Sequence, residues 1–158
     1  MSYTNQESIE ARVMRELARR SSAEDALDCI VVKFSDAVRT LCLNQGNVKD
    51  GLRMAFGSLS LAGMAAASLP DDLVQPDLKQ RVNEIIESMT NKPDFVRAPS
   101  AVPPRASRWP RRSPGYRLGT LFTTLIGMQF KTASCIAKNI WELHDCLQAG
   151  CWRLKPAG

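Results

Sequence analysis

Hydrophobic residues recur every three or four positions along most of the chain, which is the period of an amphipathic α-helix. The pattern predicts helices over residues 4–20, 22–43, 48–69 and 76–90, and a long helix over residues 118–147. No segment shows the alternation that a half-buried strand requires. We therefore expect an all-α fold, in which an antiparallel bundle of about four helices is joined to a long C-terminal helix.

Polar residues mark the expected helix ends. Thr4 and Glu7 have the spacing of a capping box, in which a hydroxyl and a carboxylate satisfy the first free amides of a helix. Ser21 and Glu24 repeat this spacing, which predicts a break near residues 20–22. The other expected boundaries are at Gly46, Pro70, Pro76 and Gly150.

Three segments of the chain differ in composition. Residues 1–90 form the expected bundle, and residues 118–158 the long helix with a short tail. Between them, residues 91–117, hereafter the basic segment, contain six of the nine prolines. Proline fixes φ and lacks an amide donor, so it fits neither a helix interior nor a central strand. We expect the basic segment to be an extended, flexible linker.

The apolar stripe of the long C-terminal helix is too extended to remain in water. It must pack on the bundle of its own chain or pair with the equivalent helix of a second chain, and the second arrangement makes a homo-oligomer. The residues of this expected interface are Leu118, Leu121, Phe122, Leu125, Met128, Ile136, Ile140, Leu143 and Leu147.

The positive charge of the 158-residue chain is concentrated in the basic segment. Its seven Lys and Arg residues against one Asp give a net charge of +6. Residues 1–90 carry −3 and residues 118–158 carry +2, within a whole-chain charge of +5. The basic character is therefore a property of the linker and not of the expected bundle.

The basic segment interleaves its arginines with Trp109 and Tyr116. Guanidinium groups bind phosphate in a bidentate manner, and indole or phenol rings stack on unpaired bases. We therefore expect it to bind nucleic acid, RNA in preference to DNA and single strands above all, as arginine-rich segments do. No RNA-recognition, zinc-finger or helix-turn-helix signature accompanies it. The expected contact residues are Arg97, Arg105, Arg108, Trp109, Arg111, Arg112, Tyr116 and Arg117.

Other interpretations of the same segment stay open. It can serve as a tether in a helical interaction adaptor or effector whose apolar grooves bind a partner helix, or as a plain solvated spacer. A membrane-surface protein is a further alternative, but no cation lies between Arg117 and Lys131, where an interfacial helix normally carries several. Ser113 before Pro114 is a candidate phosphorylation site that would reduce the local charge.

Enzymatic and metal-binding functions find little support in the sequence. His144 is the one histidine, and it lies near Cys135, Cys146 and Cys151. On a helix, positions 144 and 151 share a face and 146 points elsewhere, which fits tetrahedral zinc poorly. No phosphate-binding loop and no recognisable nucleophile context is present. We expect a non-enzymatic protein without a metal or cofactor.

Cysteine usage and the first residues indicate an intracellular compartment, the cytoplasm or the nucleus. The five cysteines are an odd number, and the polar, acidic start does not resemble a secretory signal. The longest uncharged run, residues 54–70, is short and rich in Ser, Gly and Ala, so it does not read as a membrane span. A small helical chain with few motifs is typical of an accessory protein of a virus or phage.

Overall fold

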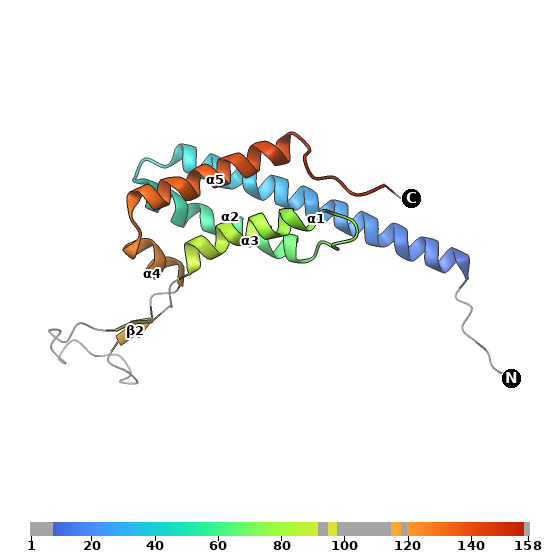
Figure 1. Cartoon of the computed structure of the whole chain (residues 1–158), viewed down its shortest axis with the longest axis horizontal. Helices are drawn as coiled ribbons and strands as arrows, with labels where there is room; N and C mark the ends of the chain where they lie inside the picture. The colour runs from blue at the N-terminus through green and yellow to red at the C-terminus, as the bar shows by residue number, and fades with distance from the viewer. Residues whose placement is uncertain (1–7, 92–94, 98–114, 118–119, 157–158) are drawn as a thin grey trace.

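The computed structural model describes residues 8–91, 95–97, 115–117 and 120–156. Five helices and a two-stranded antiparallel ribbon follow one another in these residues (Figure 1). Their bounds are α1 Ile9–Leu43, α2 Val48–Ala67, α3 Pro76–Thr90, β1 Phe95–Arg97, β2 Gly115–Arg117, α4 Thr120–Gly127 and α5 Phe130–Gln148. The predicted helical fold class is confirmed, and the short ribbon is an addition that hydrophobic spacing did not indicate.

Helix α1 is continuous, so the break predicted near residues 20–22 is wrong. Ser8 caps the helix, its hydroxyl accepting a hydrogen bond from the Ala11 amide at 3.1 Å. Ser21 stays on the exposed side, while Ala23 is buried in the core. Burial of Ala23 in the core stabilises the helical backbone at this point, whereas the local signal of Ser21 alone favours a helix end. Over its described residues, 8–90, the bundle segment therefore contains three helices and not four.

The ends of α2 and α3 agree with the polar signals. Asn47 caps α2 by accepting a hydrogen bond from the Asp50 amide at 3.0 Å, and Pro76 occupies the first turn of α3. The stripe predicted for α3 is fully buried. Its residues are Leu78, Val82, Ile85 and Met89.

Helices α2 and α3 approach closely at Gly63. A methyl group built on Gly63 would overlap the end of the Ile86 side chain. The glycine therefore allows α3 to approach the backbone of α2 at this point.

The long helix predicted over residues 118–147 is interrupted, which corrects that expectation. Gly127 ends α4, and the extended Gln129 starts α5. Gly127 has a low helix propensity, and the Met128 amide bonds back to Leu125 in a tight turn. At the other end Gly150 has φ +73°, and the Cys151 amide donates to the Cys146 carbonyl, which together make the expected glycine stop.

The C-terminal helices pack on the bundle of their own chain. Leu125 on α4 and four of the stripe residues on α5 are buried in one core with α1, α2 and α3. Leu118 and the side chain of Phe122 lie outside the described part of the chain. Of the two packing alternatives, the structure shows the one within a single chain. The stripe residues described are Leu121, Leu125, Met128, Ile136, Ile140, Leu143 and Leu147, all buried or half-buried.

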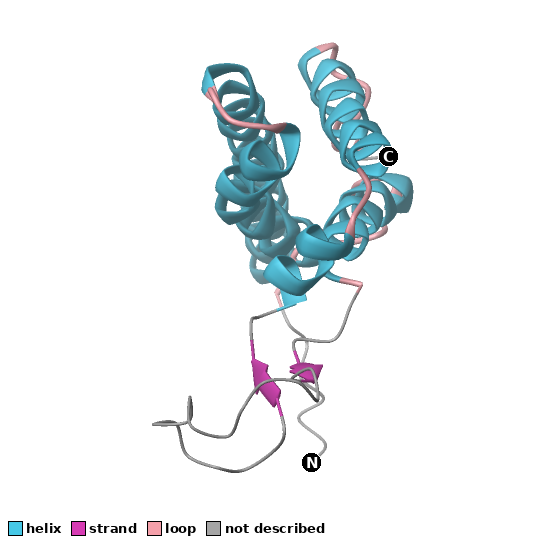
Figure 2. Cartoon of the chain, turned by 90° about the vertical axis from the view of Figure 1, so that its left-hand side faces the viewer, coloured by secondary structure: helices cyan, strands magenta, loops and turns pink. Residues whose placement is uncertain are grey.

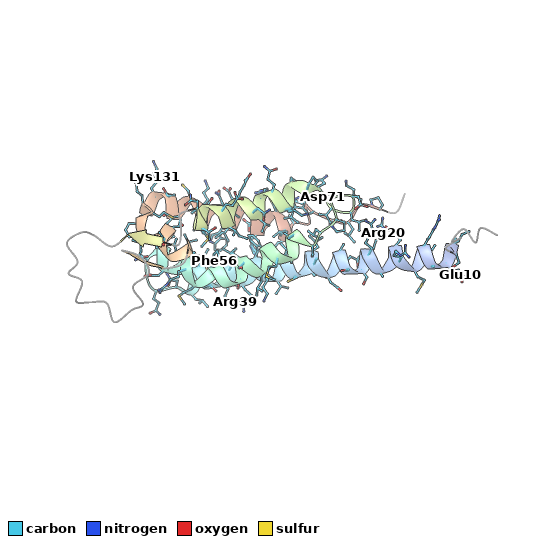
Figure 3. All side chains as sticks on the ribbon, turned by 90° about the horizontal axis from the view of Figure 1, so that it is seen from below. Glu10, Arg20, Arg39, Phe56, Asp71 and Lys131 are labelled. Carbon is cyan, nitrogen blue, oxygen red and sulfur yellow. The ribbon has the colours of Figure 1, made fainter. Side chains whose placement is uncertain are left out.

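Two parts of the fold extend beyond the main helical body. The first turns of α1 continue past the other helices, and Glu10 lies on this extension (Figures 1 and 3). The β1–β2 ribbon lies beyond α4, which β1 contacts, at the end of the helical body (Figures 1 and 2). Within the described residues, no helix is long and apolar enough to cross a membrane.

Candidate functional site

The β1–β2 ribbon brings the two ends of the basic segment together. Val96 pairs with Tyr116, and Arg97 lies directly opposite Gly115 in the antiparallel register. The chain therefore leaves β1 and returns at β2 in one place, beside α4. The seventeen intervening residues, 98–114, contain four of the expected arginine contacts and Trp109.

The predicted contact residues fall into two groups. Arg97, Tyr116 and Arg117 belong to the strands of the ribbon, where the structure defines their backbone pairing. The others lie outside the described residues, and the nucleic-acid-contact role of all eight residues stays a prediction. The residues outside the described part are Arg105, Arg108, Trp109, Arg111 and Arg112.

An open groove lies between α3 and α5 and reaches the start of the basic segment. Its main part has a volume of about 570 Å³, and an adjoining hollow beside α4 has about 440 Å³. Asn91, the first residue of the basic segment, lines both parts. The buried residues Ile85, Ile136 and Leu143 lie beneath it, and most of its exposed lining is polar. The adaptor alternative expects an apolar groove, and this groove is mostly polar.

The rim of the α3–α5 groove is acidic. Glu84 and Glu87 come from α3, and Arg81 is the cation that lines the main part. Two carboxylates against one guanidinium disfavour phosphate at this place. Of the α3–α5 groove and the basic segment, the basic segment is therefore the one suited to an anionic ligand.

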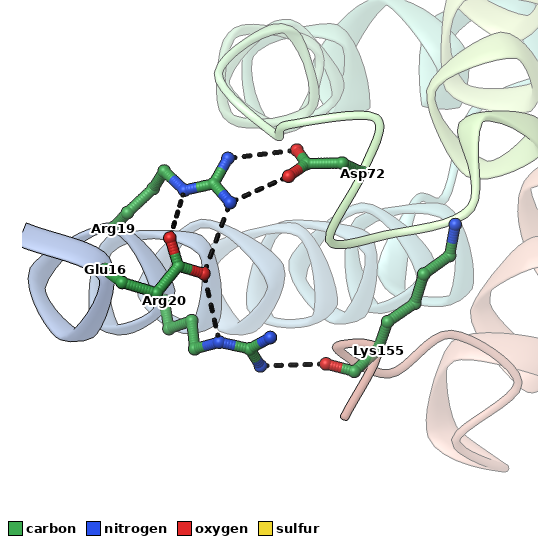
Figure 4. Close-up of polar contacts among 5 residues, drawn as sticks. All are labelled: Glu16, Arg19, Arg20, Asp72 and Lys155. Carbon is green, nitrogen blue, oxygen red and sulfur yellow. Dashed lines mark hydrogen bonds and ion pairs between the residues drawn. The ribbon is translucent and has the colours of Figure 1, made fainter. Parts of the chain in front are cut away.

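A polar cluster joins α1 to the α2–α3 loop and the C-terminal tail (Figure 4). Arg19 donates to both carboxylate oxygens of Asp72, at 3.0 and 2.7 Å, and also to Glu16. Arg20 donates to the Lys155 carbonyl at 2.8 Å. Hydrogen bonds from Arg19 hold the pKa values of Glu16 and Asp72 below their usual range. The cluster links three segments of the chain and offers no open coordination position or nucleophile.

His144 contacts Ser35 and not a cysteine. The Ser35 Oγ to His144 Nε2 distance is 3.2 Å, and Gln148 donates to the same hydroxyl at 3.1 Å. In serine hydrolases the serine–histidine pair works with an orienting carboxylate and with amides that stabilise an oxyanion. Asp145 is exposed and 3.6 Å from Nδ1, and Ser35 lies in the middle of α1, whose amides bond within the helix. We assign this contact to the packing of α5 on α1.

The cysteines near His144 do not form a metal centre with it. Among the described residues, no group of three or more His, Cys, Asp or Glu side chains is arranged to hold a metal ion. Partial desolvation and hydrogen bonding with Cys146 raise the pKa of the Cys151 thiol. A raised pKa favours the protonated thiol, which is the weaker nucleophile and ligand.

Sequence reasoning did not identify the exposed apolar residues on α1 and α2. Ile9, at the start of α1, is 80% exposed, and Met54 and Met64 on α2 are more than half exposed. Hydrophobic spacing alone does not show that Ile9 is exposed, and the first turns of α1, where Ile9 lies, continue past the other helices (Figure 1).

Comparison of the chain with models of protein families, with curated proteins and with solved structures finds no match.

Proposed function

We propose that this protein is a non-enzymatic, helical, nucleic-acid-binding protein that holds single-stranded RNA with its basic segment. The observation that carries the proposal is the charge distribution: +6 in residues 91–117, against −3 before and +2 after them. An anionic polymer is the partner that this distribution favours. Helices α1 to α5 act as the scaffold from which the segment extends.

The β1–β2 register supports this function physically. Pairing of Arg97 with Gly115 fixes both ends of the 98–114 excursion, so its arginines act from one place on the scaffold. Fixing the ends lowers the conformational entropy that an arginine-rich segment loses on binding. Trp109 and Tyr116 supply rings for stacking on unpaired bases, which favours a single strand over a duplex.

Fluorescence anisotropy of labelled single-stranded RNA tests the proposal. The variant Arg105→Ala/Arg108→Ala/Arg111→Ala/Arg112→Ala removes four cations from the basic segment and should lose most of the affinity. The matched control removes four cations from the helices and tail, as Arg39→Ala/Lys131→Ala/Lys138→Ala/Arg153→Ala. If both variants lost RNA affinity equally, the binding would depend only on the net charge of the protein, which would contradict the proposal.

An interaction adaptor is the second candidate, and the α3–α5 groove favours it. Glu84 and Glu87 on the rim of this groove suit a partner helix that carries basic residues. Asn139→Trp would fill the groove from an exposed position on α5. A cellular partner that cross-links to the wild-type protein and is lost from Asn139→Trp, with RNA binding unchanged, would support this candidate.

A further inference from the structure

Helix α2 has an apolar face on its solvent side. Met54, Leu61 and Met64 are 62%, 47% and 69% exposed. No charged residue lies between Met54 and Pro70 in the sequence. By contrast, the exposed side of α3 carries Glu84 and Glu87. A solvent-facing helix surface without charge over this length is typical of an interface.

The spacing of this surface is that of a coiled-coil seam. We define the α2 outer face as Met54, Gly57, Leu61, Met64 and Ser68, at alternating intervals of three and four residues. The opposite side of α2 is buried in the core of its own chain. Alternating intervals of three and four keep one stripe of a helix against a neighbouring helix.

We propose that the α2 outer face is a homodimer interface, in which α2 packs antiparallel against α2 of a second copy. An antiparallel pair centred on position 59 sets Met54 opposite Met64 of the second copy. It also sets Gly57 opposite Leu61 of the second copy. A Cβ atom built on Gly57 meets no atom within 4 Å, so the space above this glycine is open to a leucine side chain. The large and small residues are thus complementary about a two-fold axis.

Charges at the two ends of α2 favour the same orientation. Lys49, Asp50 and Arg53 lie in its first turns and give this end a net charge of +1, and Asp71 and Asp72 follow its last turn. An antiparallel pair brings the basic end of each helix to the acidic end of the other, whereas a parallel pair brings like charges together. Asp71 and Asp72 have ion pairs with Lys79 and Arg19 in their own chain, but their side chains are 71% and 62% exposed.

The size of the contact indicates a reversible dimer. A twenty-residue helix is about 30 Å long, and a single helix pair lies near the lower end of specific interfaces, about 1,200 Å² in total. We therefore expect dissociation in the micromolar range. The dimer does not depend on the basic segment, so this inference stands or falls independently of RNA binding.

Sedimentation equilibrium of the full chain from 1 to 500 μM tests the dimer. The wild-type protein should pass from monomer to dimer over this range, and Leu61→Glu should weaken the dimer at least tenfold. Lys138→Glu, on the exposed face of α5, is the matched control and should leave the dimer unchanged. A monomer at all concentrations, or a dimer unaffected by Leu61→Glu, would overturn the proposal.

Two further variants keep the test decisive if Leu61→Glu impairs folding. Gly57→Gln meets open space in the monomer, so it should leave the melting temperature of the monomer undiminished and still weaken the dimer. Lys49→Asp and Asp71→Lys should each weaken the dimer, and the double variant should restore it, because the register centred on position 59 sets Lys49 opposite position 69 of the second copy, two residues from Asp71. Failure of both the Gly57→Gln effect and the rescue would reject the antiparallel α2 interface.

Discussion

The indole Nε1 of Trp152 donates a hydrogen bond to Asp77 Oδ1 at 3.0 Å, which joins the C-terminal tail to the first turn of α3. Trp152 is 7% exposed, and the guanidinium of Arg81 lies 5.3 Å from its ring centroid. The Lys155 amide also donates to the Leu73 carbonyl at 2.7 Å. The tail is therefore part of the core and not an appendage.

We predict that Trp152→Ala lowers the free energy of unfolding by about 3–5 kcal/mol, because it leaves a large cavity and an unpaired Asp77. Trp152→Phe keeps an aromatic ring and loses the donor, with an expected loss of about 1–2 kcal/mol. Urea unfolding followed by circular dichroism measures both. Trp141→Ala, at a more exposed indole, serves as the control and should cost less. Equal losses at Trp141 and Trp152 would contradict the packed tail.

Arg19 makes stability depend on pH through Glu16 and Asp72. Both carboxylates have folded-state pKa values below their ordinary values of 4.5 and 3.8. Their stabilising contribution is present above those values and is lost as the pH falls through the lower, folded-state values. We predict that Arg19→Gln is less stable than wild type at pH 7 and that the difference shrinks below about pH 4.

Thermal unfolding of wild type and Arg19→Gln between pH 2.5 and 7 measures this dependence. All three side chains are substantially exposed, so high salt should also reduce the difference. Lys138→Gln, which removes a surface pair with Glu142, is the control and should show a smaller pH effect. A difference between wild type and Arg19→Gln that stays constant from pH 7 to pH 2.5 would contradict the assigned ion pairs.

Gly57 and Gly63 should respond in opposite ways to alanine. A methyl at Gly57 meets open space, so Gly57→Ala should stabilise the monomer by up to about 1 kcal/mol through helix propensity. A methyl at Gly63 overlaps Ile86, and we predict that Gly63→Ala is about 1–2 kcal/mol less stable than Gly57→Ala. Ile86→Val should relieve part of this penalty in the double variant.

Urea unfolding at a protein concentration below the range of the proposed dimer measures the two substitutions. If Gly57→Ala and Gly63→Ala stabilised the protein equally, this would contradict the close approach of α3 to α2 at Gly63.

Local patterns in the sequence were sufficient for most of the helical core. The stripe from Leu78 to Met89 is regular and has clear ends, so its helix and its buried face are as predicted. The break expected at Ser21 failed because burial of Ala23, a tertiary effect, outweighs a local capping signal. The single helix predicted over residues 118–147 was wrong because the apolar stripe continues on both sides of Gly127, although the backbone changes direction there.

The candidate sites were predictable to different degrees. The concentration of charge in residues 91–117 is visible in composition alone. The pairing of Arg97 with Gly115 could not be predicted from the sequence, because strands of three residues are too short to show an alternating pattern. The α2 outer face was missed because a helix with two apolar sides resembles one with a single wide apolar side until its neighbours are placed.

The salt dependence of RNA binding tests the central proposal most directly. About six phosphate contacts on a single strand give a slope near −4 in log affinity against log salt concentration. We predict this slope for the wild-type protein between 50 and 300 mM salt, and a slope near −1 for the variant with Arg105, Arg108, Arg111 and Arg112 replaced by alanine. No binding at micromolar protein in 50 mM salt, or a slope that the variant shares, would contradict RNA binding through the basic segment.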